Sequence, residues 1–290
     1  MQYEDRNPPE GINTPGRHPL REFLRLSAFA IIAVVLLGFT LNFVGASLGG
    51  LVPFKVELWL ANKIDSASIN AGHESPFSNE VTNTELQQYL QSVADRVINA
   101  MELEDSVQIT LHYSDDDLVN AYATIGGHVY FFKGLLSLLP HENALAMLMA
   151  HEFSHVSLRH TAKGLGGSVT LVVGSALLGV SAMENRFFGL TTTLSSTRFS
   201  REMESGADRS ALQVVNKLYG HVAGASALFE LFMQQREKNL AGGFEKFLST
   251  HPLDEQRIKQ IELLAESEEY LLQGELTPLP EEFAGWLRDR

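Results

Sequence analysis

The chain has 290 residues, enough for one substantial domain or for one domain with an appendage. Its net charge of -13 argues against broad nucleic-acid binding, because a phosphate backbone attracts a basic surface. The absence of cysteine excludes a disulfide framework, a thiolate metal site and a cysteine nucleophile.

A long apolar run follows a polar, turn-rich N-terminus. Leu26–Phe54 contains no charged residue, and a helix needs only about 20 apolar residues to cross a bilayer. A buried core helix and a cleaved signal peptide are the alternatives, the latter because Val44–Ala46 weakly resembles a cleavage site. The run is longer than a usual signal-peptide core, so we interpret residues 27–52 as a retained transmembrane helix.

The basic residues beside this run predict its orientation. Three arginines precede it closely, whereas only two lysines follow (Arg17, Arg21 and Arg25; Lys55 and Lys63). Positive residues favour the cytoplasmic side. We therefore expect residues 1–26 to form a cytoplasmic tail. The main domain is expected on the extracytoplasmic side of the inner membrane, which is the periplasm in a Gram-negative cell.

The rest of the chain predicts an α+β, mainly helical domain. Residues 53–82 are small and polar and are interpreted as a linker, and residues 83–290 as the domain. A helix is expected from Thr84, which can form a capping box with Gln87. The alternating segment 107–113 and two runs around a Gly-Gly turn predict a small sheet. Helical patterns, broken at prolines, fill most of the C-terminal half of the chain.

The stretch "MAHEFSHVSLRH" carries the clearest chemical signal. His151 and His155 are four residues apart and so share one face of a helix, where two imidazoles can bind one ion. In such a helix the glutamate after the first histidine, here Glu152, acts as a general base on the metal's water. Zinc suits imidazole ligands, and a catalytic zinc needs a third protein ligand.

His160 is a poor candidate for this third ligand. On one continuous helix it lies about 180° around the axis from His151. We therefore expect it to be turned away from the metal and the third ligand to come from elsewhere.

The stretch "SREMESGAD" offers that ligand. Glu204 and Asp208 are again one helical turn apart, and a glutamate can complete a two-histidine zinc site. Asp208 could orient a ligating histidine. Glu202 is the rival ligand, but it points about 160° away from Glu204 and has no aspartate four residues later.

These two motifs together resemble the HtpX and CAAX prenyl endopeptidase family of gluzincin metallopeptidases. The segments "NAYATIGGHVYFFKGLL" and "STHPLDEQRI" resemble further elements of the family, so the similarity covers roughly 120–258. The resemblance implies a zincin-like protease domain with a small sheet and one Zn²⁺ per chain. It implies His151, His155 and Glu204 as zinc ligands and Glu152 as the general base. It implies Asp208 as a residue that orients a ligand without binding the metal.

The two flanking segments match the family less specifically than the zinc motifs, but they suggest additional site residues. The resemblance places His251 and Arg257 near the active site, and Arg257 is expected to bind substrate there. There His251 could hold the oxyanion or occlude the metal; otherwise it is simply a residue before a helix. Asn120, Gly126 and Gly127 lie in a strand-like segment that could bind an extended substrate by β-augmentation, or form an internal hairpin.

A second apolar run, Gly164–Met183, lies between the two zinc motifs. His155 and Glu204 must meet at one ion, so the chain between them crosses a membrane either twice or not at all. The return path is short and polar, which makes two crossings unfavourable. We expect the run to pack on the domain or lie against the membrane surface, which disfavours cleavage within the membrane.

The sequence therefore predicts a membrane-anchored zinc metalloendopeptidase that cleaves protein or peptide substrates. Proteolytic quality control at the cell envelope is the role that the resemblance implies. A zinc-binding chaperone or adaptor without catalysis is one alternative, although it has no use for Glu152 as a base. A protease that processes prenylated proteins is the other.

Overall fold

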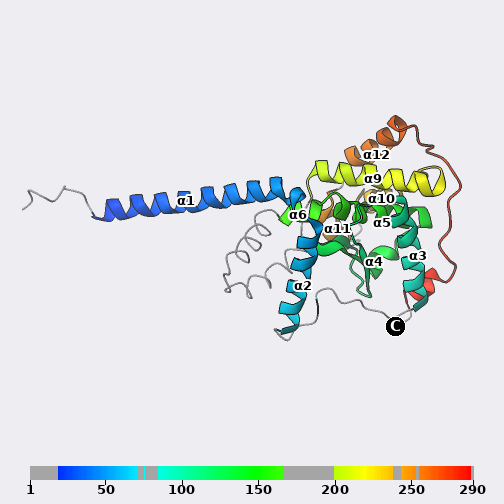
Figure 1. Ribbon diagram of the computed structural model, residues 1–290. Coiled ribbons are helices and arrows are strands. Elements are labelled where there is room, and N and C mark those ends of the chain that lie inside the picture. Colours follow the sequence, from blue (N-terminus) through cyan, green and yellow to red (C-terminus); the bar gives the residue numbers. More distant parts are fainter. Residues whose placement is uncertain are drawn as a thin grey trace, which may run out of the picture.

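The computed structural model describes residues 19–70, 75, 84–165, 199–237, 243–252 and 255–288. Helices dominate and a three-stranded sheet accompanies them, which confirms the predicted mainly helical α+β class (Figure 1). The strands are β1 (Thr110–Ser114), β2 (Ala121–Ala123) and β3 (His128–Phe132). The helices are α1 (Pro19–Leu48), η1 (Gly49–Leu51), α2 (Phe54–Asn70), α3 (Thr84–Ala100), η2 (Ile125–Gly127), α4 (Lys133–Leu136), α5 (Glu142–Ser157), α6 (His160–Leu165), α9 (Arg201–Tyr219), α10 (Ala227–Glu237), α11 (Glu245–Thr250), α12 (Glu255–Ser267) and α13 (Phe283–Trp286).

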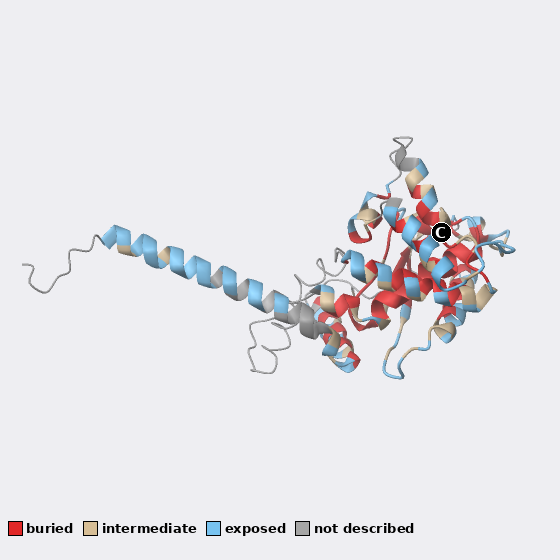
Figure 2. Cartoon of the chain, turned by 90° about the horizontal axis from the view of Figure 1, so that it is seen from above, coloured by how far each residue is buried: buried red, intermediate tan, exposed pale blue. Residues whose placement is uncertain are grey.

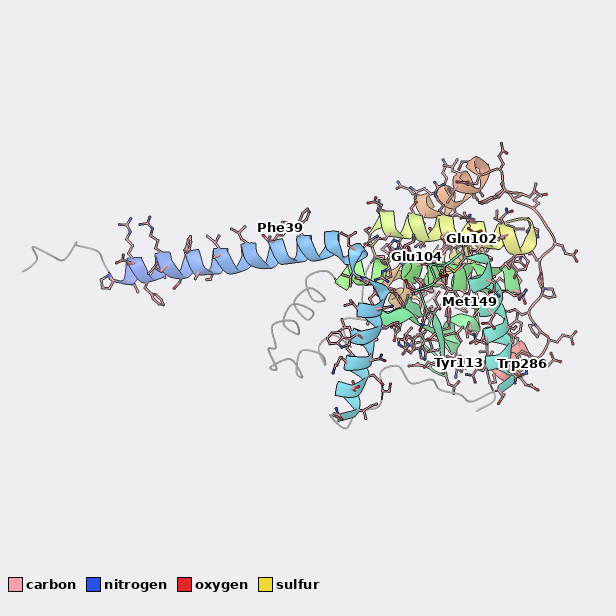
Figure 3. All side chains as sticks on the ribbon, viewed as in Figure 1. Phe39, Glu102, Glu104, Tyr113, Met149 and Trp286 are labelled. Atoms are coloured by element: carbon pink, nitrogen blue, oxygen red, sulfur yellow. The ribbon has the colours of Figure 1, made fainter. Side chains whose placement is uncertain are left out.

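Helix α5 is the centre of the fold. Every residue from Glu142 to Val156 is buried, the polar residues of the helix as well as its many apolar ones. α9 and α3 pack against it, and Figure 3 shows Met149 in the middle of the body. The helix begins just after Pro140, and His141 caps it, its Nδ1 accepting a hydrogen bond from the backbone N–H of Ala144 at 3.1 Å. The HExxH motif is thereby held on a rigid, buried helix.

The sheet lies beside α5 in the order β1-β3-β2. β1 runs parallel to β3, and β2 pairs antiparallel with β3. Phe131 on one face of the sheet meets Phe153 of α5 edge-on, with ring centroids 6.2 Å apart. β1 begins at Thr110, three residues later than the strand-like segment 107–113 suggested. The sheet thus packs against the zinc-motif helix at Phe153, inside the HExxH motif.

Helix α9 brings the second motif to α5. The hydroxyl of Ser200 accepts a hydrogen bond from the backbone N–H of Met203 and so caps the helix start. The helix ends at Gly220, whose φ of 76° is the left-handed conformation that glycine adopts most easily. Ala207 and Ala211 are fully buried, and such small side chains allow α9 to approach its neighbour closely.

The N-terminal helix α1 extends away from the body (Figure 1), and its described side chains are mostly exposed (Figure 2). A helix thus forms where residues 27–52 were expected to span a membrane. Across the residues that the structure describes, however, none of the helices has the length and apolar character to cross a bilayer. The transmembrane prediction is therefore not confirmed. The second apolar run lies outside the described residues from position 166 onward.

The predicted linker 53–82 begins with a helix rather than with irregular chain. α2 buries Phe54, Leu60, Ala61 and Ile64 on one face and packs across η2. Apolar residues recur at helical spacing in this stretch, which explains the helix; the assignment of 53–82 as a linker stays a prediction.

A buried carboxylate ties α5 to its two helical neighbours. Glu142 accepts hydrogen bonds from the hydroxyls of Tyr89 (2.9 Å) on α3 and Tyr219 (3.0 Å) on α9. Arg96 completes the cluster with an ion pair at 2.9 Å. Burial beside this carboxylate raises the pKa of both tyrosines, so they stay protonated as donors. One side chain thus fixes the start of α5 against α3 and α9.

Replacing Glu142 by glutamine is expected to lower the free energy of unfolding by about 2 kcal/mol, because hydrogen bonds to a charged acceptor become weaker or are lost. Urea titration followed by circular dichroism measures the change. Glu102→Gln is the matched control, since the side chain of Glu102 is 82% exposed and pairs only with a surface lysine, Lys217. Equal stability of the two variants would contradict the role assigned to Glu142.

Candidate metal centre

Four buried side chains from three parts of the chain form one cluster. All their donor atoms lie within 4.8 Å of one another (His151 and His155 on α5, Glu204 on α9, His251 after α11). Nε2 of His151 lies 3.1 Å from Nε2 of His155 and 3.3 Å from Nδ1 of His251. The same Nδ1 of His251 lies 3.1 Å from Oε1 of Glu204. The three side chains predicted as ligands are therefore brought together, with His251 as a fourth donor.

The donor set fits a zinc ion. Three imidazole nitrogens converge at about hydrogen-bonding distance, and a single shared cation can satisfy all three. Imidazole nitrogen and carboxylate oxygen are ligands that zinc prefers. The cluster is also buried, where unpaired polar groups are costly. The residues of this site would thus hold zinc through His151, His155 and Glu204.

The charges around the cluster are strongly coupled. Burial by itself would lower the pKa of His151, but the carboxylates of Asp208 and Glu204 outweigh it and raise this pKa to about 9. Burial likewise opposes ionisation of Glu204, but His251 and His151 hold its pKa well below the usual range. Burial and the neighbouring His151 lower the pKa of His155. The site therefore favours an ionised carboxylate beside a neutral His155.

Asp208 lies directly behind the first ligand. Its Oδ1 is 2.9 Å from Nδ1 of His151, on the side of the ring away from the cluster. Arg257 of α12 holds the same carboxylate with two hydrogen bonds of 2.8 Å and also pairs with Glu204. Burial would raise the pKa of Asp208, yet Arg257 keeps it below its usual value. Arg257 thus belongs to the framework that orients the ligands.

His251 supplies a donor beyond the three protein ligands that a catalytic zinc site uses. Its ring stacks on Phe247, with centroids 4.9 Å apart, and its Nδ1 faces the ligands. Its Nε2 lies 3.4 Å from Oε1 of Glu152. A catalytic zinc keeps one coordination position for water. Of the two roles considered for His251, this geometry favours occlusion of the metal.

Glu152 is fully buried next to the cluster. Apart from the approach of His251, no described residue forms a hydrogen bond with its carboxylate. A buried acceptor that is left free beside a metal site is suited to take a proton from water.

His160 is not one of the four clustered donors, as expected, but it lies next to the centre rather than turned away from it. Its ring is buried, and its Nδ1 lies 3.0 Å from Nδ1 of His155. The prediction assumed one continuous helix, but α5 ends at Ser157 and a separate helix, α6, begins at His160. Burial, and to a lesser extent Lys163, lower the pKa of His160 to about 4, so its ring is neutral.

The residues predicted to bind substrate lie in different surroundings. Gly126 and Gly127 have φ values of 76° and 80° and are buried under α2 and the segment before β1. A side chain at Gly127 would meet the carbonyl oxygen of Gln108 at 1.8 Å, so the turn itself requires glycine. Asn120 is fully buried before β2, and no described residue forms a hydrogen bond with its side-chain amide. A substrate role for these residues stays a prediction.

Replacing Glu204 by alanine is expected to weaken zinc binding by more than about 100-fold, the upper end of the loss found for residues that only orient a ligand. Competition with a chromogenic chelator measures the dissociation constant. Glu202→Ala is the matched control, because Glu202 is exposed on the same helix turn. Loss of zinc in the Glu202 variant alone would show that the third ligand is misassigned.

Comparison with known proteins agrees with this geometry. Residues 84–265 match peptidase family M48. The beta-barrel assembly-enhancing protease of Escherichia coli is 32% identical over 188 residues, covering 60% of this chain and 37% of the relative. The mitochondrial metalloendopeptidase OMA1 of Schizosaccharomyces pombe is 32% identical over 181 residues, covering 60% of this chain and 51% of the relative.

The chain thus spans about a third to a half of the length of these relatives, 37% and 51%. Neither relative is named as an HtpX or CAAX prenyl endopeptidase, so that finer resemblance is not confirmed. The broader prediction of a gluzincin metallopeptidase is confirmed, because the family match includes both zinc motifs and covers well over half of the residues. The chain belongs to peptidase family M48.

Proposed function

We propose that this protein is a zinc-dependent metalloendopeptidase that hydrolyses peptide bonds in protein substrates. The observation that carries the proposal is the convergence of His151, His155 and Glu204 in one buried cluster beside the carboxylate of Glu152, which forms no hydrogen bond with a described residue. A purely structural zinc site needs no such base. This disfavours a non-catalytic chaperone or adaptor. No feature of the described residues favours a prenylated substrate.

Different residues of the site are proposed to have different roles in peptide-bond hydrolysis. When bound, zinc lowers the pKa of a water and polarises the substrate carbonyl. Glu152 accepts the proton of the attacking water and then donates it to the leaving amine. Asp208 holds His151 through its Nδ1, and Arg257 holds Asp208 while it also pairs with Glu204.

The substrate chain is proposed to pair with β2. β2 lies at one end of the described sheet order, so its outer edge is not paired within that sheet. An extended peptide can add to such an edge through main-chain hydrogen bonds. Asn120, directly before β2, carries a buried amide that could meet the peptide backbone.

The proposed setting is proteolytic quality control at a cell-envelope membrane, with the catalytic domain on the extracytoplasmic side. Two observations support it. Relatives bear the names beta-barrel assembly-enhancing protease and mitochondrial metalloendopeptidase. In addition, α1 exposes large apolar side chains along its length, among them Phe23, Phe29 and Phe39, the last of which is labelled in Figure 3. We propose that α1 attaches the domain to a membrane.

Membrane attachment is tested by flotation with phospholipid vesicles. The full chain is expected to float with the vesicles, because exposed apolar area is removed from water on binding. A variant with Phe29, Val35 and Phe39 all changed to aspartate is expected to stay at the bottom of the gradient. As a control, three aspartates replace exposed residues of α12 instead. Flotation of the α1 variant at the wild-type level would contradict the attachment.

The enzymatic proposal is tested on purified protein. We expect about one zinc per chain and cleavage of casein that stops with a chelator and returns when zinc is added back. A zinc-binding chaperone would instead hold the metal and leave casein intact.

A further inference from the structure

We propose that His160 is a positioning residue for the metal centre, whose Nδ1 accepts a hydrogen bond from Nδ1–H of His155 and so directs Nε2 of His155 toward the metal. The inference rests on the ligand set of the proposed function. It adds His160, which is not a ligand and lies at the end of the histidine-rich stretch that begins at Met149.

A turn between α5 and α6 places His160 beside His155. α5 ends at Ser157, and Arg159 adopts a φ of 62°, a left-handed conformation that is uncommon for a residue with a side chain. Arg159 is held there by an ion pair of 2.7 Å with the buried Glu57 and by a hydrogen bond to the carbonyl of Val52. The N-terminal segment thus stabilises the turn that brings His160 back beside His155.

The two nitrogens of His155 face opposite partners. Nε2 points into the cluster, 3.1 Å from Nε2 of His151, and Nδ1 lies 3.0 Å from Nδ1 of His160. A metal ion on Nε2 requires the proton of a neutral His155 to be on Nδ1. Nδ1–H then donates to His160, which accepts on Nδ1 and keeps its own proton on Nε2.

The contact parallels the arrangement at the first ligand. Asp208 contacts Nδ1 of His151, and His160 likewise contacts Nδ1 of His155. A partner that receives the other ring N–H fixes both the tautomer and the orientation of a ligating histidine. Phe199 stacks on the face of His155, with centroids 3.8 Å apart, and restricts tilting of the ring. His160 therefore supplies the remaining constraint, rotation about the side chain, without adding another negative charge.

The test compares two substitutions in the full chain. His160→Phe keeps an aromatic ring of similar size beside Phe199 but cannot accept a hydrogen bond, whereas His160→Asn offers an acceptor oxygen near the position of Nδ1. The zinc dissociation constant is measured by chelator competition, and the unfolding of the zinc-free protein by urea titration. His112→Phe is the control, since His112 is a buried histidine that contacts His128 instead of the cluster.

We expect His160→Phe to weaken zinc binding by about 10- to 100-fold, the range found for residues behind a ligand. The zinc-free protein should unfold as the wild type does, and His160→Asn should recover most of the affinity. Wild-type zinc affinity in His160→Phe would overturn the proposal, as would an equal loss of affinity in both variants, because the acceptor would then be irrelevant. A His155→Ala variant that binds zinc normally would instead show that the ligand set itself is wrong.

Discussion

Replacement of Glu152 by glutamine is expected to lower kcat/KM for casein or a peptide substrate by about 10²–10⁴-fold, the contribution typical of a general base. Glutamine has nearly the shape of glutamate but cannot take a proton from the attacking water. Glu152 is fully buried and is not one of the four clustered donors, so the zinc affinity should stay close to the wild-type value. The loss should therefore appear in catalysis and not in metal binding.

Zinc content and activity are measured on the same preparations. Glu202→Gln, on the exposed side of α9, is the control for the chemical change and should cleave at the wild-type rate. If Glu152→Gln cleaves as fast as the wild type, the assignment of the base is wrong. A variant that is slow only because it has lost zinc would place Glu152 in the metal site instead.

The parts of the site that lie within one helix could be predicted from the sequence. The spacing of four residues between His151 and His155, and between Glu204 and Asp208, has a fixed meaning once the segment is helical. The structure places both pairs on buried helix faces. The metal centre could be anticipated because two such pairs need only one close helix–helix contact to meet.

The position of His160 could not be predicted in this way. The left-handed turn at Arg159 has no glycine to mark it, and its stabilising partner, Glu57, lies about a hundred residues earlier in the chain. Periodicity describes residues within one helix and carries no information across its end. A contact between distant segments decided where this side chain lies.

His251 and the Gly126–Gly127 turn illustrate the same limit. His251 reaches His151 across 100 residues of sequence, and its pattern before Pro252 equally suits an ordinary helix boundary. The two glycines were correctly interpreted as a turn, but only the packing of α2 shows that the turn is covered. The sequence predicted the local conformation in both cases and left the tertiary partner open.

Substitution of His251, the fourth donor of the cluster, is expected to raise peptidase activity, whereas substitution of Glu152 lowers it. Replacing His251 by alanine is expected to raise peptidase activity at saturating zinc by about tenfold or more, because minor open states of proteins are commonly populated at about 0.1–10%. In the structure Nδ1 of His251 lies beside the ligands, where it would compete with a water for bound zinc, and its Nε2 approaches Glu152. Removal of the ring gives water access to the zinc ligands and to Glu152. It also removes one donor of the cluster, so the zinc affinity should fall.

Activity is therefore assayed over a zinc titration, so that weaker binding is separated from a higher rate of the loaded enzyme. His221→Ala is the matched control, because His221 is also buried but pairs with the carbonyl of Glu275, in a different part of the domain. Its activity should equal that of the wild type. If the His251 variant is instead slower at every zinc concentration, His251 stabilises the oxyanion during catalysis, and the closed four-donor arrangement does not limit the rate. The two substitutions, at Glu152 and at His251, thus change opposite sides of one water position: the first removes the group that activates the water, and the second removes the ring that keeps it out.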